Sequence, residues 1–508
     1  MFSGILTLVN EVAGLFTITN IALLFGSSLL GIIVGVLPGL TATMGIAILT
    51  GITFGMPTYQ ALIILMGIYV GAIFGGAIPT VLLGIPGTAA ASATVLDGHP
   101  LAKQGHGGLA LTTVAIASFI GTLFGMFFLA GLTPLAVRMA LLFTSPEFAL
   151  LAIFGVTICG SLTGGGKGGT ALKGWIAGLI GLLVSTVGFE VFYAFPRFSY
   201  GNINLMGGIA FVPAMIGLFG IPSVLNQLSI LHQKNVLHFA KEKTSGSLKI
   251  VGKKMPMILR SGMIGVGTGV IPGVGEDVSA WISYDLAKKT SKEPEKFGKG
   301  SFEGLIAPET ANSAAIGGSI IPTLSLGIPG SPPTAVLMGA LMLHGIRPGP
   351  MISIENPTFI AHISAILLLA AFTMRFGALI ACRFAPMMLK VPANILMPMV
   401  AVLSCIGAFA LTINIFDLYV MLFFGLIGYA FDKMKYPAAP VVLGIILGPI
   451  VDENLRRTLV ATGGSLEPFF TRPVALIILF AIALTILSQL GVIKKLKSAI
   501  FSRKAKTS

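Results

Sequence analysis

Charged residues are scarce in this chain of 508 residues: Asp, Glu, Lys and Arg make up 10% of it, whereas 55% is hydrophobic. Soluble domains carry about 25% charged residues, so this scarcity excludes an ordinary soluble protein. None of the charges lies between Val12 and Leu96. Because a helix crosses a bilayer with about 20 apolar residues, that stretch alone holds roughly three crossings. Similar stretches elsewhere predict an all-α polytopic membrane protein with about 11 to 13 membrane segments, several of them broken.

Cysteine and catalytic motifs are also lacking. The three cysteines lie inside apolar runs without the spacing of a metal site or a disulfide framework. The sequence has no HExxH or GxSxG motif. Ser161–Gly168 resembles a phosphate-binding loop but lacks its first Gly and the Ser or Thr after the lysine. We therefore expect neither an enzyme nor an ATPase, and no cofactor.

The positive charge is confined to loops and the tail. The net charge is +14, but its place beside apolar segments argues against nucleic-acid binding and for the cytoplasmic side of a membrane. The basic segments are His232–Arg260, Asp285–Gly300 and the tail with Lys494, Lys495, Lys497, Arg503, Lys504 and Lys506. The C-terminus is therefore expected in the cytoplasm.

Two of these basic loops enclose a single apolar segment, Ser261–Tyr284. If both loops are cytoplasmic, the segment must enter the membrane and return. Its middle, Gly269–Gly275, contains Pro272 and several glycines that permit a reversal. The pattern favours a re-entrant hairpin, whose non-helical tip is tolerated only against protein or a polar cavity. The alternative is one ordinary crossing with a basic loop on each side.

The chain contains an internal repeat. Pro79–Gly87 (PTVLLGIPG) recurs as Pro322–Gly330 (PTLSLGIPG), identical at seven of nine positions. Upstream, Gly35–Gly39 (GVLPG) recurs as Gly269–Gly273 (GVIPG), and a weaker third echo follows each copy. Chance does not explain three matches in the same order. The predicted organisation is a first transmembrane repeat over 1–230, a basic cytoplasmic loop over 231–260, a second repeat over 261–493 and a basic cytoplasmic tail over 494–508. We expect inverted repeats, although the number of crossings leaves this open.

Paired Gly/Pro interruptions in two halves mark the binding site of a secondary transporter. Interrupted helices present N-termini to anions and unwound carbonyls to cations such as Na⁺. The alternative is that Pro and Gly only kink packed helices. The residues expected to bind substrate are Pro38, Gly39, Thr41, Thr43, Pro86, Gly87, Thr88, Pro272, Gly273, Gly275, Pro329, Gly330 and Ser331.

Acidic residues near the interruptions are candidates for ion coupling, because ionisable groups are costly inside a membrane. Glu276 and Asp277 follow the turn of the second half and have no acidic counterpart in the first. They could instead cap a helix or be solvated. Glu309, Asn312 and Ser313 share a helical face whose oxygens suit a hard cation. With the hydroxyls of Thr80 and Thr323, these residues form the predicted coupling site for Na⁺ or H⁺.

At these motifs the sequence resembles the large membrane subunit (TctA) of the tripartite tricarboxylate transporter family. The resemblance rests on Gly35–Leu40, Pro79–Gly87, Asp97–Pro100, Arg197–Gly201, Ile271–Gly275, Phe297–Gly300, Glu303–Gly304, Ala307–Glu309 and Pro322–Ser331, and it covers essentially the whole chain. It implies a multi-pass protein of the bacterial inner membrane that imports citrate-like, dicarboxylic or other organic acids with an ion. It also implies two partners, a small TctB-like membrane subunit and a periplasmic TctC-like solute-binding protein.

Several points stay open at this level. The resemblance names neither the acid nor the ion, and a homodimer is one candidate for the oligomeric state. A channel or an exporter for small anions is the alternative function.

Overall fold

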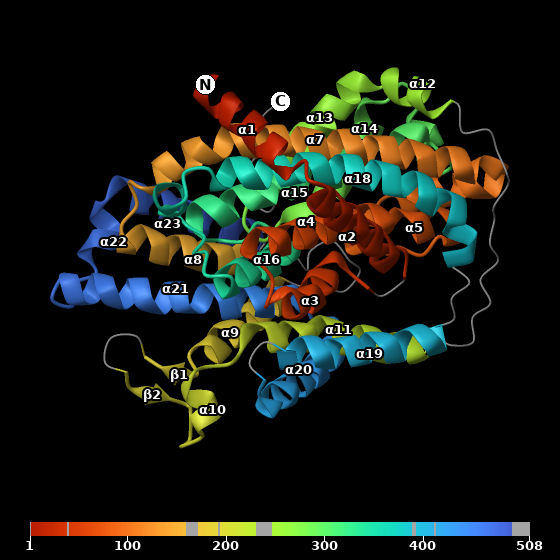
Figure 1. The fold of residues 1–508 in the computed structure, drawn as a ribbon. Helices are drawn as coiled ribbons and strands as arrows, with labels where there is room; N and C mark the ends of the chain where they lie inside the picture. The colour runs from red at the N-terminus through yellow and green to blue at the C-terminus, as the bar shows by residue number, and fades with distance from the viewer. Residues whose placement is uncertain are drawn as a thin grey trace, which may run out of the picture. The chain divides into compact units, whose positions relative to one another are not determined.

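The structure, a computed structural model, describes residues 2–37, 40–158, 171–190, 194–229, 246–388, 393–410 and 413–489. Almost all of the regular structure in these ranges is helical (Figure 1). One small antiparallel pair, β1 (Gly188–Phe189) and β2 (Pro196–Arg197), forms the sheet of the described chain. The predicted all-α fold is confirmed.

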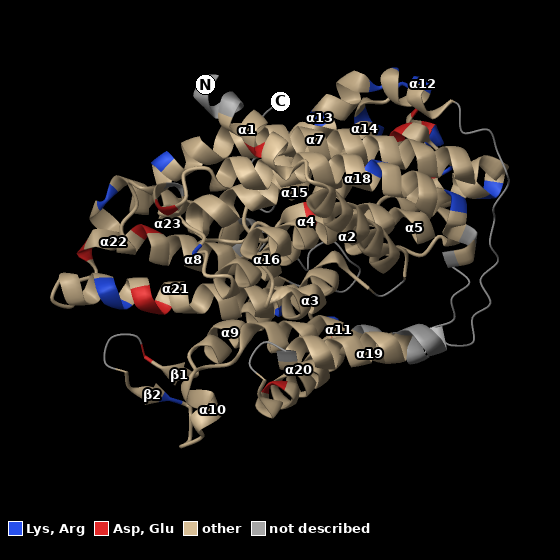
Figure 2. Cartoon of the chain, viewed as in Figure 1, with Lys and Arg blue, Asp and Glu red and all other residues tan. Residues whose placement is uncertain are grey.

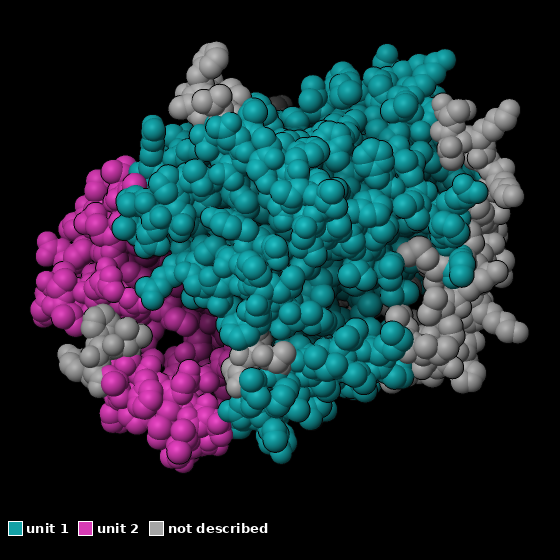
Figure 3. All heavy atoms as spheres, in the orientation of Figure 1, with its two compact units in different colours: residues 1–140, 212–429 teal, residues 141–211, 430–508 magenta. Residues whose placement is uncertain are grey.

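The chain divides into two compact units, coloured in Figure 3. Unit 1 comprises 1–140 and 212–429, and unit 2 comprises 141–211 and 430–508. Each unit therefore contains segments from both predicted repeats. The predicted sequential boundaries concern the repeats and stay a prediction.

Unit 1 begins with the elements of the first repeat. They are α1 (Phe2–Leu15), α2 (Ile18–Val36), α3 (Ala42–Thr53), α4 (Thr58–Gly75), α5 (Ala77–Leu83), the 3-10 turn η1 (Ala89–Ala91), α6 (Val95–Leu101), the π-helical turn η2 (Ala102–His106) and α7 (Gly107–Ala140). Helix α4 packs against α2 and α3.

The remaining elements of unit 1 lie further along the chain. They are α11 (Phe211–Ser229), α12 (Ser247–Gly252), α13 (Met255–Val270), α14 (Gly275–Thr290), the 3-10 turn η4 (Pro294–Lys296), α15 (Phe302–Leu326), α16 (Pro332–Leu343), α17 (Ile352–Glu355), α18 (Phe359–Met388), α19 (Ala393–Ala410) and α20 (Ile415–Lys433). Helix α15 packs against α7, α13 and α14.

Unit 2 is a smaller helical body built around α21. Its elements are α8 (Ser145–Ile158), α9 (Ala171–Ser185), β1, β2, α10 (Ile203–Met206), α21 (Ala439–Ala461), α22 (Glu467–Thr471) and α23 (Pro473–Gln489). Helix α21 packs against α8 and α9, and Gly181 and Gly444 let α9 and α21 approach closely. An ion pair between Arg197 and Asp452, 2.8 Å apart, ties β2 to α21.

Five helical stretches of the described chain are long and apolar enough to cross a membrane. They are Ile18–Val36, Thr58–Leu83, Val95–Ala140, Phe359–Ala385 and Ile415–Lys433. Charged side chains are sparse along the ribbon (Figure 2), as expected for helices in lipid. The chain is thus a multi-pass membrane protein, while the predicted total of segments stays a prediction.

The segment predicted to be a hairpin folds as one. Helix α13 ends at Val270, a short turn follows, and α14 begins at Gly275 and packs back against α13. Gly273 and Gly275 have positive φ angles of 77° and 56°, a conformation that favours glycine. Each helix has 16 residues, or about 24 Å, which is shorter than the hydrocarbon core of a bilayer. This geometry favours the hairpin over one ordinary crossing, and the side of the membrane on which its two ends lie stays a prediction.

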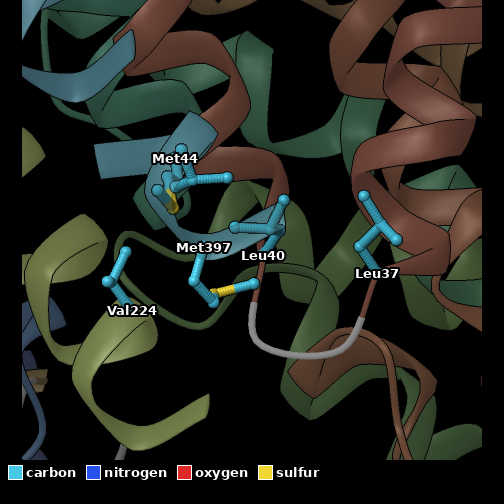
Figure 4. Packing of buried hydrophobic residues seen from close by; sticks show 6 residues of the cluster. Leu37, Leu40, Met44, Val224 and Met397 are labelled. Atoms are coloured by element: carbon cyan, nitrogen blue, oxygen red, sulfur yellow. The ribbon is translucent and has the colours of Figure 1, made fainter. Parts of the chain in front are cut away.

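The corresponding turn of the first repeat is anchored in apolar packing. Pro38 and Gly39 lie outside the described residues, but Leu37 and Leu40 on either side are buried. Figure 4 shows this cluster, which also contains Met44 of α3, Val224 of α11, and Met397 and Val400 of α19. The turn between α2 and α3 is thus held by helices distant in sequence.

Candidate functional site

The first interruption forms a close helix crossing, here called the first crossing: Gly35, Gly76, Thr80, Gly87 and Thr88. After the left-handed Gly84, which ends α5, the chain returns toward the end of α2. A Cβ added to Gly87 would lie 2.4 Å from Gly35 O and 2.8 Å from Gly76 O. The Gly87 N–H donates to Gly76 O at 3.2 Å, and the Thr80 hydroxyl donates to the same oxygen at 2.6 Å. This backbone contact leaves no room for a side chain at Gly87.

The second interruption repeats this geometry in the second crossing: Gly269, Ser319, Thr323, Gly330 and Ser331. A left-handed Gly327 ends α15 as Gly84 ends α5. A Cβ added to Gly330 would lie 2.5 Å from Gly269 O and 2.5 Å from Ser319 Cα. The Thr323 hydroxyl donates to Ser319 O at 2.7 Å. Each contact has its equivalent in the first crossing, so the repeat seen in the sequence is also a repeat in three dimensions.

Glu276, buried at the start of α14, lies beside the second crossing. Its Oε1 accepts hydrogen bonds from the Tyr69 hydroxyl of α4 and from the Ser331 hydroxyl, the latter at 3.1 Å. The hydroxyl oxygens of Tyr69 and Ser331 are 3.2 Å apart. Thr334 forms a capping box with Ser331 at the start of α16. We call Tyr69, Glu276, Ser331 and Thr334 the Glu276 cluster. It joins α4 of the first repeat to α14 and α16 of the second.

Glu309, fully buried in α15, is the centre of a second polar group. Thr94, just after η1, donates to its Oε1 at 2.6 Å, and Ser118 of α7 donates to its Oε2 at 3.3 Å. One turn further along α15, the Ser313 hydroxyl donates to Asn312 Oδ1 at 3.1 Å. We call Thr94, Ser118, Glu309, Asn312 and Ser313 the Glu309 cluster. It also joins the two repeats.

Neither buried carboxylate has a cationic partner in the part of the chain that the structure describes. The ion pairs of the described residues lie elsewhere, and the side chains that donate hydrogen bonds to Glu276 and Glu309 are uncharged. A buried charge is stable only when it is paired or neutralised. These two carboxylates are therefore suited to bind a cation or a proton.

The two repeats also contact one another through equivalent positions. Tyr69 lies ten residues before Pro79, and Asn312 lies ten residues before Pro322. Tyr69 reaches Ser331 after the second interruption, whereas Asn312 Nδ2 donates to Ala90 O after the first, at 3.4 Å. Helix α3 packs against α16, and α14 packs against η1. Each repeat thus contacts the interruption of the other.

A third buried carboxylate, Asp97 of α6, has a structural role. Its Oδ1 accepts the N–H groups of Gly298, Gly300 and Ser301 at 2.7–3.0 Å, and Oδ2 accepts the Tyr284 hydroxyl at 2.9 Å. These N–H groups precede α15, whose positive end favours a carboxylate. Asp97 therefore fixes the start of α15 to the first repeat.

Most of the predicted site residues that the structure describes are buried. The buried ones are Thr43, Gly87, Thr88, Pro272, Gly273, Gly275, Pro329, Gly330 and Ser331, and Thr41 caps α3 by accepting the Met44 N–H. Pro86 and Asp277 are exposed in this chain, and Asp277 does not join the Glu276 cluster. Glu309, Asn312 and Ser313 lie together as expected. The binding and coupling roles themselves stay predictions.

The sequence reasoning missed the residues that hold the two acids. Tyr69, Thr94 and Ser118 lie in apolar stretches without a motif of their own. Only Tyr69 carried a signal: it occupies the position of Asn312 when the repeat is extended upstream. Thr94 and Ser118 become identifiable only through packing across the repeats.

Comparison with known proteins identifies the family of the chain. The sequence model of the tripartite tricarboxylate transporter TctA family matches residues 21–443. The chain belongs to the TctA family. An uncharacterized 52.8 kDa protein in the TAR-I ttuC' 3' region of Agrobacterium vitis is 34% identical over 493 residues, 96% of each chain. An uncharacterized protein in the TAR-II ttuC' 3' region of the same organism is 34% identical over 234 residues, 46% of this chain and 97% of its own length.

Family membership gives the coarse function. A TctA protein is a membrane component of a tricarboxylate transport system, and the family name describes a tripartite system with further subunits. No solved structure matches the chain. The two crossings and the two acid clusters are therefore described from this TctA chain alone.

Proposed function

We propose that this TctA chain is the permease that imports an organic carboxylate together with Na⁺ or H⁺. The observation that carries the proposal is the pair of matched crossings, with two buried carboxylates held across the repeats. Paired interruptions of this kind are the structural signature of secondary transporter sites.

Ion coupling follows from the charges of the two clusters. Glu276 and Glu309 are 2% and 0% exposed, and the side chains that donate hydrogen bonds to them in the described structure are uncharged. Burying two uncompensated negative charges is costly, so binding a cation or a proton stabilises the arrangement in which both carboxylates are buried. Such binding can also change the relative stability of two conformations, which is what coupling requires.

The substrate is proposed to be a citrate-like tricarboxylate or a dicarboxylate. At the ends of the interruptions, α3 begins after Thr41 and α16 begins after Ser331. Helix N-termini carry partial positive charge and free N–H groups, which favour carboxylates. Thr41 and Thr43 lie at the first of these starts, and Pro329, Gly330 and Ser331 at the second, so the anion is proposed to bind there through backbone N–H groups and hydroxyls.

The partners and the location complete the proposal. A small TctB-like membrane subunit and a periplasmic TctC-like binding protein are proposed to deliver the acid to a permease in the bacterial inner membrane. The C-terminus and both basic loops are placed in the cytoplasm by the positive-inside rule. Cysteines introduced at the exposed Lys253 and Lys292, at the two ends of the hairpin, should then react only from the cytoplasmic side. Labelling from opposite sides would contradict this placement.

The transport test uses membrane vesicles that contain the chain, the small subunit and the binding protein. Uptake of radiolabelled organic acids is measured with Na⁺ and proton gradients imposed separately. We expect one acid to accumulate, saturably, under one of the two gradients. Uptake that does not saturate would support a channel, uptake without the binding protein would contradict the tripartite system, and no driven uptake of any acid would contradict the proposal.

A further inference from the structure

Two buried hydroxyl groups at the crossings have no hydrogen-bond partner in the described structure. They are Thr88 Oγ1 and Ser319 Oγ, on side chains that are 6% and 0% exposed. Buried hydroxyls almost always form a hydrogen bond, because an unpaired one has lost its interaction with water. Two such groups at two equivalent crossings therefore require an explanation.

The two hydroxyls come from different positions but occupy corresponding places. In the first crossing Gly76 has no side chain, and a Cβ added there would lie 2.4 Å from Thr88 Oγ1. In the second crossing the equivalent of Gly76 is Ser319, which supplies its own hydroxyl. The equivalent of Thr88 is Ser331, which is engaged with Glu276. Each crossing thus has one hydroxyl without a hydrogen-bond partner among the described residues, located at Gly76 in the first crossing and at its equivalent, Ser319, in the second.

Further oxygen atoms belong to each crossing. Gly35 O and Gly269 O belong to the last turns of α2 and α13, where carbonyls have no following turn to bond. They approach Gly87 and Gly330 so closely that an added Cβ would lie within 2.5 Å of them. The Thr80 and Thr323 hydroxyls lie next to the Gly76 and Ser319 carbonyls.

This donor set suits a hard monovalent cation. Carbonyl and hydroxyl oxygens of interrupted helices are the ligands that bind Na⁺ in secondary transporters. A carboxylate substrate would instead need several hydrogen-bond donors, but the Gly87 N–H is already donated to Gly76 O, and the Gly35 and Gly269 carbonyls can only accept. The oxygens therefore point to a cation rather than to the organic acid.

We propose that each crossing binds one Na⁺, with Thr88 as the side-chain ligand of the first site and Ser319 as that of the second. This inference rests on the ion coupling proposed above and names both the ion and its number. Two Na⁺ ions also offset two negative charges of a dicarboxylate or tricarboxylate. Glu276 then adds negative charge beside the second site through its hydrogen bond with Ser331, without itself being a ligand.

The test is the Na⁺ dependence of acid uptake in the complete three-component system, with choline replacing Na⁺. The Hill coefficient of the unmodified chain should approach two, since it can rise to the number of interacting sites. Thr88→Val and Ser319→Ala should each lower it to about one and raise the half-saturating Na⁺ concentration about tenfold. Thr88→Ser keeps the hydroxyl and should restore both values.

Two further variants serve as matched controls. Thr50→Val and Ser325→Ala remove buried hydroxyls that are bonded to carbonyls of their own helices. Both should leave the Na⁺ dependence unchanged. If a test variant loses all uptake, ²²Na⁺ binding to the purified complex replaces the assay. Two ions should bind to the unmodified complex and one to each variant.

Three results would overturn the inference: uptake driven by protons alone, a Hill coefficient of one in the unmodified chain, or unchanged Na⁺ dependence in both variants. The last result would mean that the hydroxyls bind water only. Failure of the proposed function gives a different result, because neither gradient would then drive uptake in the unmodified system.

Discussion

The two repeats share a backbone but differ in chemistry. Their crossings share the left-handed Gly84 and Gly327 and the glycines that admit no Cβ. The acids are not shared: the second repeat has Glu276 and Glu309 where the first has Ala42 and Met66. The repeat thus preserves a helix geometry, whereas the acids of the two clusters lie in the second half only.

In place of acids, the first repeat contributes hydroxyl groups. Tyr69 donates to Glu276 and Thr94 donates to Glu309, so each acid of the second repeat is held by the first. Neither repeat alone completes either cluster. Both repeats therefore contribute the backbone geometry, and the acids are stabilised where the two repeats contact each other.

The strongest test of the shared geometry adds one methyl group to either crossing. Gly87→Ala and Gly330→Ala should each abolish uptake, because the new Cβ would lie 2.4 or 2.5 Å from a backbone oxygen. Overpacking of this kind costs about 1–3 kcal/mol locally and shifts the helix ends. Gly267→Ala is the control, since nothing lies within 4 Å of a Cβ there. If both crossing variants reach the membrane in normal amounts and take up the acid normally, the crossings are not required for transport.

The contact between the repeats is tested at Tyr69. Tyr69→Phe removes the hydroxyl that donates to Glu276, and a hydrogen bond to a charged group contributes about 1.5–3 kcal/mol. We expect driven uptake to fall about ten- to hundredfold. Tyr59→Phe, at an exposed position of the same helix, should have no effect. Equal uptake rates in the two variants would show that the Tyr69 hydroxyl has no part in transport.

The structural anchor Asp97 should affect stability more than ion dependence. Asp97→Asn weakens three hydrogen bonds from N–H groups before α15 and one from Tyr284. The free energy of unfolding should fall by about 2 kcal/mol, measured as a lower Tm of the purified protein. The half-saturating Na⁺ concentration of the remaining uptake should not change. A shifted ion dependence at unchanged Tm would place Asp97 in the coupling machinery instead.

The smallest effect is expected in the charged segment that only the second repeat carries. Lys289 pairs with Asp285 one turn away, and both side chains are more than half exposed. Exposed pairs contribute about 0–1 kcal/mol, so Lys289→Ala should leave both Tm and uptake within error. A large loss of uptake would indicate that this segment contacts another subunit.

The features of the fold that leave a pattern in the sequence could be predicted from it. Charge scarcity predicted the membrane helices, and the Pro/Gly motifs predicted both the repeat and the hairpin of α13 and α14. The matched crossings extend that pattern into packing, because the same glycines recur. The sequence could not predict which hydroxyls face Glu276 and Glu309. Thr94 and Ser118 meet Glu309 only through the contacts of three segments far apart in the chain.

Asp277 shows a different limit of sequence reasoning. It neighbours Glu276 and has the same charge, yet Glu276 is buried against Tyr69 while Asp277 is exposed. On a helix, adjacent residues point about 100° apart, so one acid faces the crossing and the other does not. Only the position of α14 against its neighbours decides which of the two is buried.

The most direct test of the central claim is gradient-driven accumulation of the transported acid by Glu276→Gln and Glu309→Gln variants. Gln keeps the size of the side chain and removes its charge. The account predicts that both variants reach the membrane in normal amounts but no longer accumulate the acid against its gradient. Accumulation by both variants at the level of the unmodified chain would contradict the claim that the two repeats together form an ion-coupled site.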